Sequence, residues 1–241
     1  MHSNRLTNAP IGVLYEDNHL LVVSKPAGML SQGDISCDEN VQDLMKRYVA
    51  EKYKKPGNVF LALVQRLDRP VGGVMVLART SKAASRLSEQ LRNRTVQKEY
   101  LAVVQGARFP PARIHRLEHF VVKHQETRMA RVCDADGAGA KRAHLDFEIM
   151  AQNEPYALLK IQLLSGRFHQ IRVQLSAAHM PIAGDFKYGF TGPDTMPGTI
   201  ALWCYQIAFE HPTTGEILKF TSHPPIHLNP WIRFEKAIRI I

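Results

Sequence analysis

Short runs of apolar residues separated by polar turns dominate the first third of the sequence. Runs at residues 13–15 and 19–24 precede a turn at 25–28, and runs at 60–64 and 74–78 flank a polar loop. Short apolar runs bounded by Gly, Pro or Asn are typical of β-strands. We therefore predict two pairs of strands in this region.

Two segments among these strands repeat their apolar residues at helical spacing instead. The first spans residues 38–53, with Asp38 as the predicted N-cap, and the second spans roughly residues 81–94. The second predicted helix is basic and amphipathic. Its apolar face consists of Ala84, Leu87 and Leu91.

The remainder of the sequence is again rich in strand patterns. One helix is predicted after Ser165 and Gly166, with Ile171 and Leu175 on its buried side. Strands outnumber helices and no regular βαβ alternation is present, so we predict a mixed α+β fold with a largely antiparallel sheet and flanking helices. No linker or repeat interrupts the pattern, and we expect a single catalytic domain over residues 1–241. The predicted strands of this part are 100–104, 145–149, 158–163, 200–209 and 217–221.

The net positive charge of the chain indicates which class of partner it binds. Lys and Arg number 31 against 22 Asp and Glu, a formal net charge of +9, and the hydrophobic content of 45% excludes wholesale disorder. A positive field attracts polyanions, of which nucleic acids are the commonest inside cells. The basic residues cluster in two places: Lys46, Arg47, Lys52, Lys54 and Lys55, and then Arg86, Arg92, Arg94 and Lys98.

Membrane and secretory signals are absent from the pattern. The longest apolar stretches are strand-sized and too short to span a bilayer, and the first residues contain no apolar signal-peptide core. The three cysteines, Cys37, Cys133 and Cys204, are far apart and free of any CxxC motif. They predict reduced, buried thiols and a cytoplasmic protein.

The polar loop QRLDRPVGG at residues 65–73 is the first candidate for chemistry. It sets Asp68 between Arg66 and Arg69, and a nearby guanidinium favours and orients an ionised carboxylate. Taken alone, the same residues also fit a turn capped by an aspartate with solvated arginines.

Two further segments carry candidate residues. The stretch SGRFHQIRVQL at 165–175 would offer backbone N–H groups near Gly166 to a phosphate if it opens a helix, with His169 and Arg172 one turn apart. The stretch QKEYL at 97–101 carries Tyr100, which can stack on a base and still offer its hydroxyl group. A surface helix edge and simple packing are the plainer interpretations of these two segments.

Taken together and in order, these segments resemble the RluA-type RNA pseudouridine synthases over nearly the whole chain. The stretch YEDNHLLVVSKPAG at 15–28 is similar to the opening motif of that family, and the Asp68 loop is similar to its HRLDxxTSG-like catalytic motif. The stretch 165–175 resembles TGRTHQIRVQL. Further matches lie at 98–100, 181–189 and 209–215.

The resemblance implies an isomerase that converts uridine in RNA into pseudouridine without a metal or other cofactor. The glycosidic bond breaks, the uracil rotates while bound, and a carbon–carbon bond forms to the ribose. Asp68 matches the essential aspartate, Tyr100 the residue that stacks on the uracil and helps to remove its C5 proton, and Arg172 the basic partner of the aspartate. Polar neighbours in the same segments are expected to bind the substrate: Gln65, Arg66, Arg69, Arg167 and His169.

The sequence departs from the family pattern at several positions. Gln65 stands where the family usually has histidine, Phe168 replaces a threonine, and the stretch LWC at 202–204 replaces Leu-His-Ala. Asp68, Tyr100 and Arg172 are unaffected, so we expect an active enzyme.

Two other classes of protein remain as alternatives. A catalytically impaired RNA-binding protein or RNA chaperone on the same fold would keep the basic surface but lose turnover. A metal-dependent hydrolase would use His115, His119 and His124, although their spacing is loose and the residues between them indicate a strand. Asp134 and Asp136 are interpreted as part of a hairpin turn.

The RNA target is not encoded in any readable motif. The opening motif begins near Ile11, so we expect a stand-alone catalytic domain without an N-terminal RNA-binding module, acting as a monomer on either tRNA or rRNA. Residues that select the RNA are expected in loops at 29–40 and 108–124.

Overall fold

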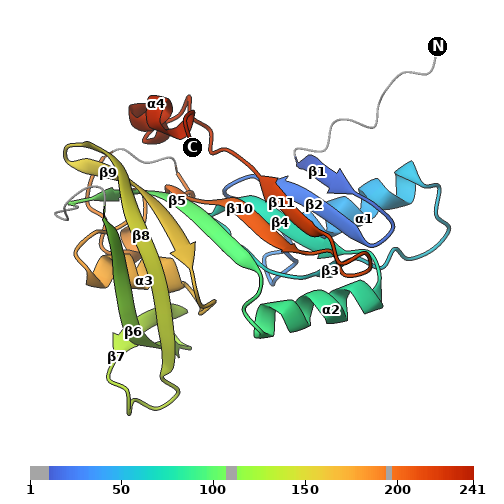
Figure 1. Cartoon of the computed structure of the whole chain (residues 1–241), viewed down its shortest axis with the longest axis horizontal. Coiled ribbons are helices and arrows are strands. Elements are labelled where there is room, and N and C mark those ends of the chain that lie inside the picture. Colours follow the sequence, from blue (N-terminus) through green and yellow to red (C-terminus); the bar gives the residue numbers. More distant parts are fainter. Residues whose placement is uncertain (1–10, 107–112, 194–196) are drawn as a thin grey trace. The chain divides into compact units, whose positions relative to one another are not determined.

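The computed structural model describes residues 11–106, 113–193 and 197–241, which fold into two compact units (Figure 1). Of these described residues, unit 1 contains those up to Val96 and Ile207–Ser222, and unit 2 contains those between Gln97 and Gln206 and His223–Ile241.

Unit 1 is built on antiparallel strands. The order of its strands is β1-β2-β4-β10, with β3 paired to β4 and β11 paired to β10. Only the last residues of β10 belong to this unit. Its elements are β1 (Gly12–Glu16), β2 (Leu20–Lys25), α1 (Val41–Lys52), β3 (Ala62–Leu63), β4 (Gly72–Ala78), α2 (Ser81–Arg92), β10 (Leu202–Glu210) and β11 (Ile217–Thr221).

The two central strands of unit 1 are apolar on both faces because each face packs in a separate core. Successive side chains of a strand point to opposite faces. Leu21 and Val23 of β2 accordingly pack in a cluster with Met45 of α1. Leu20 and Val22 pack in the other cluster with Leu87 of α2. β2 and β4 are therefore packed on both faces. This packing fixes the end of β2 and the start of β4, which follows the loop that carries Asp68.

The helix boundaries of unit 1 differ in detail from the prediction. Asn40, not Asp38, caps α1, because the Asn40 side chain accepts from the backbone N–H of Asp43 at 3.0 Å. Asp38 instead forms an ion pair with Arg69, with 2.8 Å between their charged atoms. On α2, Leu87 is buried and Leu91 packs against the same cluster as predicted, whereas Ala83 is buried in place of Ala84.

Unit 2 holds a second set of strands, in the order β10-β5-β9-β8-β6-β7, in which all pairs from β5 to β7 are antiparallel. The sequence did not predict β7. Residues 114–124 form strand β6, whereas we expected a strand only around residues 120–122 and a loop over the rest of this segment. Residues 108–112 of that expected loop lie outside the described part of the chain. The elements are β5 (Gln97–Gln105), β6 (Ile114–His124), β7 (Met129–Cys133), β8 (Lys141–Asn153), β9 (Tyr156–Leu163), α3 (Gln170–Ala177), α4 (Glu235–Ile238) and two 3₁₀ turns, Phe186–Tyr188 and Trp231–Phe234.

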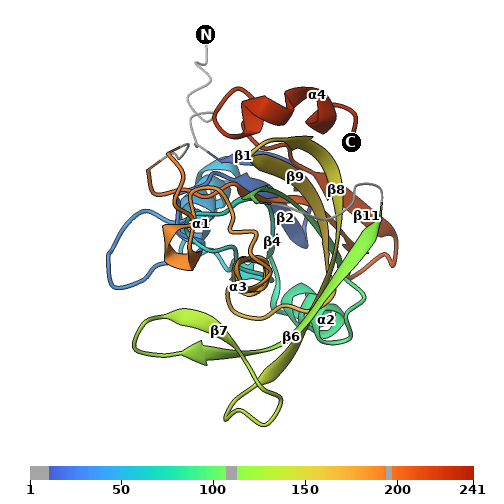
Figure 2. The same ribbon diagram turned by 90° about the vertical axis from the view of Figure 1, so that its left-hand side faces the viewer.

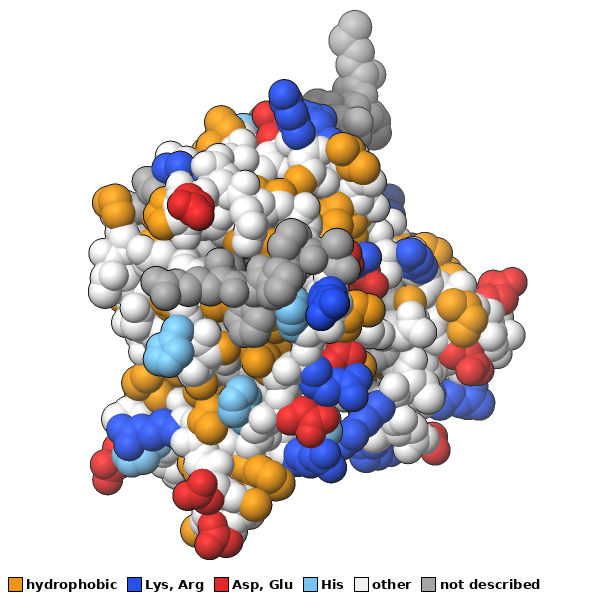
Figure 3. All heavy atoms as spheres, turned by 60° about the vertical axis from the view of Figure 1, so that its left-hand side comes forward, with side chains coloured by type: hydrophobic (Ala, Val, Ile, Leu, Met, Phe, Trp, Pro, Cys, Tyr) orange, Lys and Arg blue, Asp and Glu red, His pale blue; other side chains and the backbone are white. Residues whose placement is uncertain are grey.

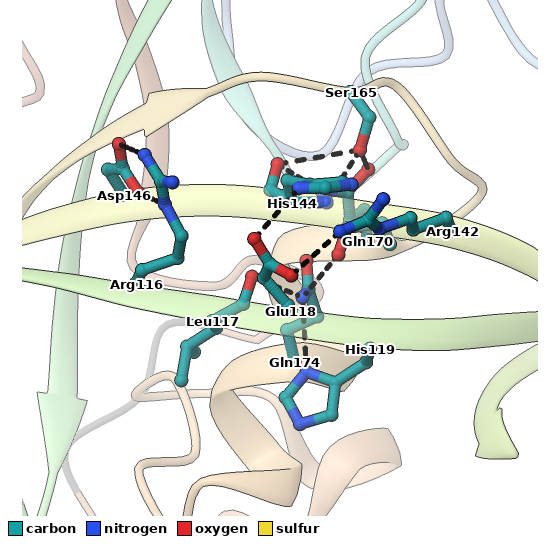
Figure 4. Close-up of polar contacts among 11 residues, drawn as sticks. Arg116, Leu117, Glu118, His119, Arg142, His144, Asp146, Ser165, Gln170 and Gln174 are labelled. Atoms are coloured by element: carbon teal, nitrogen blue, oxygen red, sulfur yellow. Dashed lines mark hydrogen bonds and ion pairs between the residues drawn. The ribbon is translucent and has the colours of Figure 1, made fainter. Parts of the chain in front are cut away.

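Helix α3 packs inside the curve of the unit 2 strands (Figure 2). Val173 of α3 contacts a small cluster that includes Val121 of β6 and Ala143 of β8. The Gln174 side chain is fully buried and its amide nitrogen donates to the backbone oxygens of Leu117 and Ala143 at 3.1 and 3.2 Å (Figure 4). These bonds fix the helix against both strands.

The fold class predicted from the sequence is confirmed: the structure is α+β with a mostly antiparallel sheet. A turn does form at Asp134 and Asp136, where the Gly137 N–H donates to the Asp134 oxygen at 3.1 Å. It does not close a hairpin as predicted, because the strands it connects, β7 and β8, pair with opposite sides of β6 and not with each other. No helix in the described ranges is long and apolar enough to cross a membrane.

The cysteine prediction is only partly correct. Cys204 is buried, but Cys133 is partly exposed and Cys37 is exposed. All three are free thiols. The burial of a thiol cannot be read from cysteine spacing, because it depends on which face of an element the residue occupies.

Candidate active site

The backbone on the N-terminal side of Asp68 is fixed by one serine. The Ser31 hydroxyl donates to the Leu67 carbonyl oxygen at 2.6 Å and accepts from the Leu67 N–H at 3.1 Å. Ser31 and Leu67 are 5% and 6% exposed. Both backbone groups of the residue before Asp68 are therefore satisfied by a single buried side chain, which restricts how the loop can move.

The C-terminal side of Asp68 is fixed by the turn that follows β2. The Arg69 carbonyl oxygen accepts from the Gly28 N–H at 2.8 Å and from the Lys25 ammonium at 3.2 Å. Arg69 Nε donates back to the Gly28 oxygen at 3.1 Å. Gly28 adopts φ 88°, a conformation that favours glycine. The half-buried Asp68 thus sits on a turn clamped from both sides.

Lys25 forms the base of this clamp. It is fully buried at the end of β2, and its ammonium also donates to the carbonyl oxygens of Pro26 and Met29 at 3.0 and 2.6 Å. Burial lowers the pKa of Lys25 to about 7, Asp68 opposes that shift, and Arg69 adds to it. The Lys25 amine therefore lies close enough to Asp68 for the charges of the two groups to interact.

The other predicted residues of this loop have distinct surroundings. The Gln65 side-chain amide donates to the Val74 carbonyl oxygen at 3.2 Å and so anchors the loop to β4. Arg66 is exposed, whereas Arg69 holds Asp38 as well as Gly28. An exposed arginine beside the carboxylate is suited to contact a phosphate or a base.

In unit 2, Arg172 has a carboxylate partner that the sequence analysis did not predict. Its guanidinium forms a two-pronged ion pair with Asp185, at 2.7 and 2.8 Å, and both side chains are buried. The guanidinium also lies over the Tyr188 ring, 4.9 Å from its centre. Asp68 belongs to unit 1, so its expected pairing with Arg172 stays a prediction.

The segment before α3 is a turn, not the first turn of a helix. The backbone N–H of Arg167 donates to the Gln170 side-chain oxygen at 3.0 Å, and α3 begins only at Gln170. The phosphate site considered near Gly166 required a helix to begin there. Because α3 begins only at Gln170, that prediction is wrong. Arg167 Nε instead donates to the Arg142 carbonyl oxygen at 3.1 Å.

His169 and Arg172 are brought together by Tyr188. His169 Nδ1 lies 2.8 Å from the Tyr188 hydroxyl oxygen, which accepts from the Ala130 N–H at 2.7 Å. His169 itself adopts a left-handed conformation with φ 50°. The two predicted residues thus contact the hydroxyl and the ring face of one buried tyrosine.

Tyr100 lies on β5 and is 7% exposed. Its side chain is hydrogen-bonded to Cys204, and burial raises the pKa of the Cys204 thiol to about 12. Burial lowers the pKa of Lys98, two residues earlier, and the charge of Cys204 opposes this shift. The strand thus places a tyrosine hydroxyl and an ammonium in a largely desolvated environment.

Several surface charges in each unit form ion pairs. On α1, Arg47 and Lys52 form ion pairs with Glu39 and Glu16, at 2.7 and 2.6 Å. On the outer face of β6 and β8, acidic and basic side chains alternate (Figures 3 and 4). The pairs there are Arg116 with Asp146, and Glu118 with Arg142 and His144.

The three histidines proposed as metal ligands are engaged elsewhere. His115 stacks on Phe147, with 5.1 Å between ring centres, and His119 Nδ1 lies 3.1 Å from the Gln174 amide nitrogen. His124 Nδ1 lies 3.3 Å from the Thr127 hydroxyl oxygen. Within the described ranges, no three His, Cys, Asp or Glu side chains form a group that could hold a metal ion.

Comparison with known proteins identifies the family. A sequence profile described as RNA pseudouridylate synthase matches residues 19–177, which include both the Asp68 turn and α3. The chain belongs to this family. The match covers more than half of the chain and confirms the resemblance deduced from the motifs.

Individual relatives match a larger share of the chain. The chain is 34% identical over 224 residues to ribosomal large subunit pseudouridine synthase C of Pasteurella multocida, which covers 91% of this chain and 66% of the relative. It is 31% identical over 245 residues to ribosomal large subunit pseudouridine synthase D of Nitrosomonas europaea, covering 92% of this chain and 64% of the relative. The chain thus spans about two thirds of the length of these relatives.

A solved structure supports the fold. The structure of human RNA pseudouridylate synthase domain containing 4 superposes with a TM-score of 0.75 at 23% identity, covering 95% of this chain and 93% of that one. At this identity the likeness concerns the fold alone.

Sequence reasoning missed three residues that hold predicted site residues within their own unit: Lys25 and Ser31 in unit 1, and Asp185 in unit 2. Asp185 is the single carboxylate in the matched stretch 181–189, which was a usable signal. Lys25 lay within the opening motif without an assigned role. Ser31 had no signal, because a serine in a loop is ordinarily solvated.

Proposed function

We propose that the protein is an RNA pseudouridine synthase that isomerises uridine in ribosomal or transfer RNA, with Asp68 as the catalytic carboxylate. The observation that carries the proposal is the clamped turn, which occurs in a chain of this family and lies within the matched residues. The names of the two bacterial relatives favour ribosomal RNA as the first substrate to test.

The chemistry asked of the chain is an isomerisation in which every atom of the uridine is retained. The bond from uracil N1 to ribose C1′ breaks, a bond from C5 to C1′ forms, and the proton leaves C5 while N1 gains one. Asp68 serves either as a nucleophile toward the ribose or as a base toward a ribose proton. Both routes need an ionised, oriented carboxylate, and the fixed turn supplies one with little reorganisation during the reaction.

Tyr100 and Arg172 have supporting roles in this proposal. Tyr100 stacks on the target uracil and takes part in removing the C5 proton, and the desolvated surroundings of its hydroxyl suit a proton transfer. Arg172 provides fixed positive charge. Its orientation is held by Asp185, so it pays little conformational entropy when it binds a second anionic group.

The reach of the enzyme into folded RNA depends on extracting the base. Flipping a uridine costs a few kcal/mol of stacking and pairing. Stacking on an aromatic ring returns about 1–3 kcal/mol per base. Exposed basic residues such as Arg66 would contact RNA phosphates, and these contacts weaken as the salt concentration rises.

The test is pseudouridine formation in two pools of unmodified transcript, one of bacterial large-subunit rRNA and one of tRNAs, with uridine tritiated at C5. Tritium release and mass-spectrometric detection of pseudouridine from the wild type support the proposal and identify the RNA class. Binding of both pools without any release would instead favour the catalytically impaired RNA-binding protein.

A Tyr100→Phe variant separates the two roles given to Tyr100. It should bind RNA with nearly wild-type affinity, because the ring is retained, but form pseudouridine more slowly, because the hydroxyl is lost. A wild-type rate in this variant would assign the hydroxyl no part in the reaction.

A further inference from the structure

Phe168 presents a partly exposed aromatic ring immediately before His169 and α3. Its exposed fraction is 38%, and its ring stacks on the His169 ring with 3.8 Å between centres and 20° between planes. The Lys123 ammonium lies 4.9 Å from the Phe168 ring centre. A single exposed apolar side chain needs no explanation. The His169 ring that supports this side chain and the ammonium group over it do require an explanation.

The support behind Phe168 is rigid. His169 is held by the Tyr188 hydroxyl at 2.8 Å, and the two rings meet edge to face, with 83° between their planes. Tyr188 is 5% exposed, and its hydroxyl accepts from the Ala130 N–H on β7. A ring backed in this way keeps its orientation before any ligand arrives, so binding to it costs little conformational entropy.

The charged groups next to the ring are basic. Lys123 is exposed on β6, and Arg167, directly before Phe168, is held by the Arg142 carbonyl oxygen. A stacked nucleobase is worth about 5- to 150-fold in affinity. An exposed cation–π contact is worth only about 2- to 5-fold. A base can therefore take the place of the Lys123 ammonium over the ring, and the flexible lysine is then free to contact a phosphate.

We propose that Phe168 is a stacking platform for a nucleobase of the bound RNA, with Lys123 contacting a neighbouring phosphate. The proposal rests on the proposed function, because it takes RNA as the ligand. It concerns a base other than the uracil assigned to Tyr100. The threonine that the related motif carries at this position has no aromatic face, so the platform is a feature of this chain.

A photocrosslink tests the contact in the wild-type protein. Large-subunit rRNA transcripts containing 5-iodouridine are bound, irradiated and digested with nuclease and trypsin. Trypsin cuts after Arg167 and Arg172, so Phe168 is recovered in the peptide FHQIR. Crosslinked nucleotide on Phe168 supports the proposal. Crosslinks confined to other peptides overturn it.

Substitutions test the energetic part. Phe168→Trp keeps an aromatic face and should stay within about threefold of wild-type RNA affinity, whereas Phe168→Leu should lose about 5- to 20-fold. The loss should appear in Kd and KM, with kcat nearly unchanged. Phe60→Leu is the matched control, since Phe60 is 52% exposed in unit 1 and has been given no role.

Salt dependence separates the platform from its lysine. Stacking is not screened, so the loss in Phe168→Leu should be the same at 50 and 200 mM salt. The loss in Lys123→Ala should shrink at the higher concentration and reduce the salt slope by about one. A loss in Phe168→Leu that Phe168→Trp shares, or one confined to kcat, would show that Phe168 only supports His169 and would refute the platform.

The proposal fails separately from the proposed function. If the wild type forms pseudouridine while Phe168→Leu binds and turns over RNA like the wild type, the platform alone is wrong. If the wild type neither binds RNA nor forms pseudouridine, both are wrong. A wild type that binds without turnover still allows the crosslink and the affinity arms to decide on the platform.

Discussion

Replacing Ser31 with alanine should destabilise the protein and slow catalysis more than its size suggests. The substitution removes one hydroxyl, but that hydroxyl satisfies both the N–H and the C=O of Leu67. Each buried backbone group left without a partner costs about 1–3 kcal/mol. With two such groups, we expect the free energy of unfolding to fall by about 2–6 kcal/mol. Because Leu67 precedes Asp68, a looser turn should also lower kcat.

The assay pairs this variant with a second serine of the same unit. Ser24→Ala removes a hydrogen bond of 2.6 Å between two hydroxyls, Ser24 and Ser222, and leaves no backbone group unsatisfied. That loss should cost about 1 kcal/mol or less. Urea unfolding gives the free energies of both variants, and tritium release under single-turnover conditions gives their rates at saturating protein.

Two results would refute the reasoning. Equal destabilisation by Ser31→Ala and Ser24→Ala would show that the Leu67 groups find other partners. A destabilised Ser31→Ala that keeps the wild-type rate at a temperature where it is folded would show that the position of Asp68 does not depend on this clamp.

Three further predictions concern other groups. The folded-state pKa of Lys25 is about 7, below its ordinary value of 10.5, so the unfolded chain binds more protons between these pH values and stability should rise with pH there. The difference in unfolding free energy between wild type and Lys25→Met, measured in urea, should accordingly increase by up to about 1.4 kcal/mol per pH unit; a flat difference would contradict the shift. Asp185→Asn breaks the buried pair with Arg172 and should lower the free energy of unfolding by about 3 kcal/mol. Glu118→Gln, which breaks an exposed pair with Arg142, should lower it by less than about 1 kcal/mol. Similar unfolding midpoints for the two variants would show that burial does not matter to the pair. At pH 8 a thiol reagent should label the exposed Cys37 in the native protein but label Cys204 only after unfolding, and native labelling of Cys204, detected by mass spectrometry, would be inconsistent with its burial and its pKa of about 12.

The fold class could be predicted because its strands have simple patterns. The runs in β2 and β4 are apolar on both faces, and short strands of that kind between turn residues leave little choice. Strand β7 could not be predicted, since its sequence MARVC shows weak alternation and its register comes from pairing with β6. The cap of α1 was misplaced for a similar reason: Asp38 and Asn40 are both good caps, and the contact of Asp38 with Arg69 decides between them.

The candidate site was predictable by motif but not by geometry. The matched stretches pointed to Asp68, Tyr100 and Arg172, yet none of them indicated what holds these residues. Lys25 ends an apolar strand, where a lysine is ordinarily solvated. Its burial follows from three backbone oxygens that converge in space, and two of these belong to the turn that directly follows it. Asp185 likewise becomes a partner of Arg172 only once the chain has turned after α3.

The most direct test of the central claim is Asp68→Asn, with RNA binding and pseudouridine formation measured in the same samples. Asparagine keeps the size of the side chain and removes its charge. The account predicts RNA affinity within a few-fold of the wild type, an unchanged unfolding midpoint and no detectable tritium release. Release at a rate near that of the wild type would contradict the assignment of Asp68 as the catalytic carboxylate.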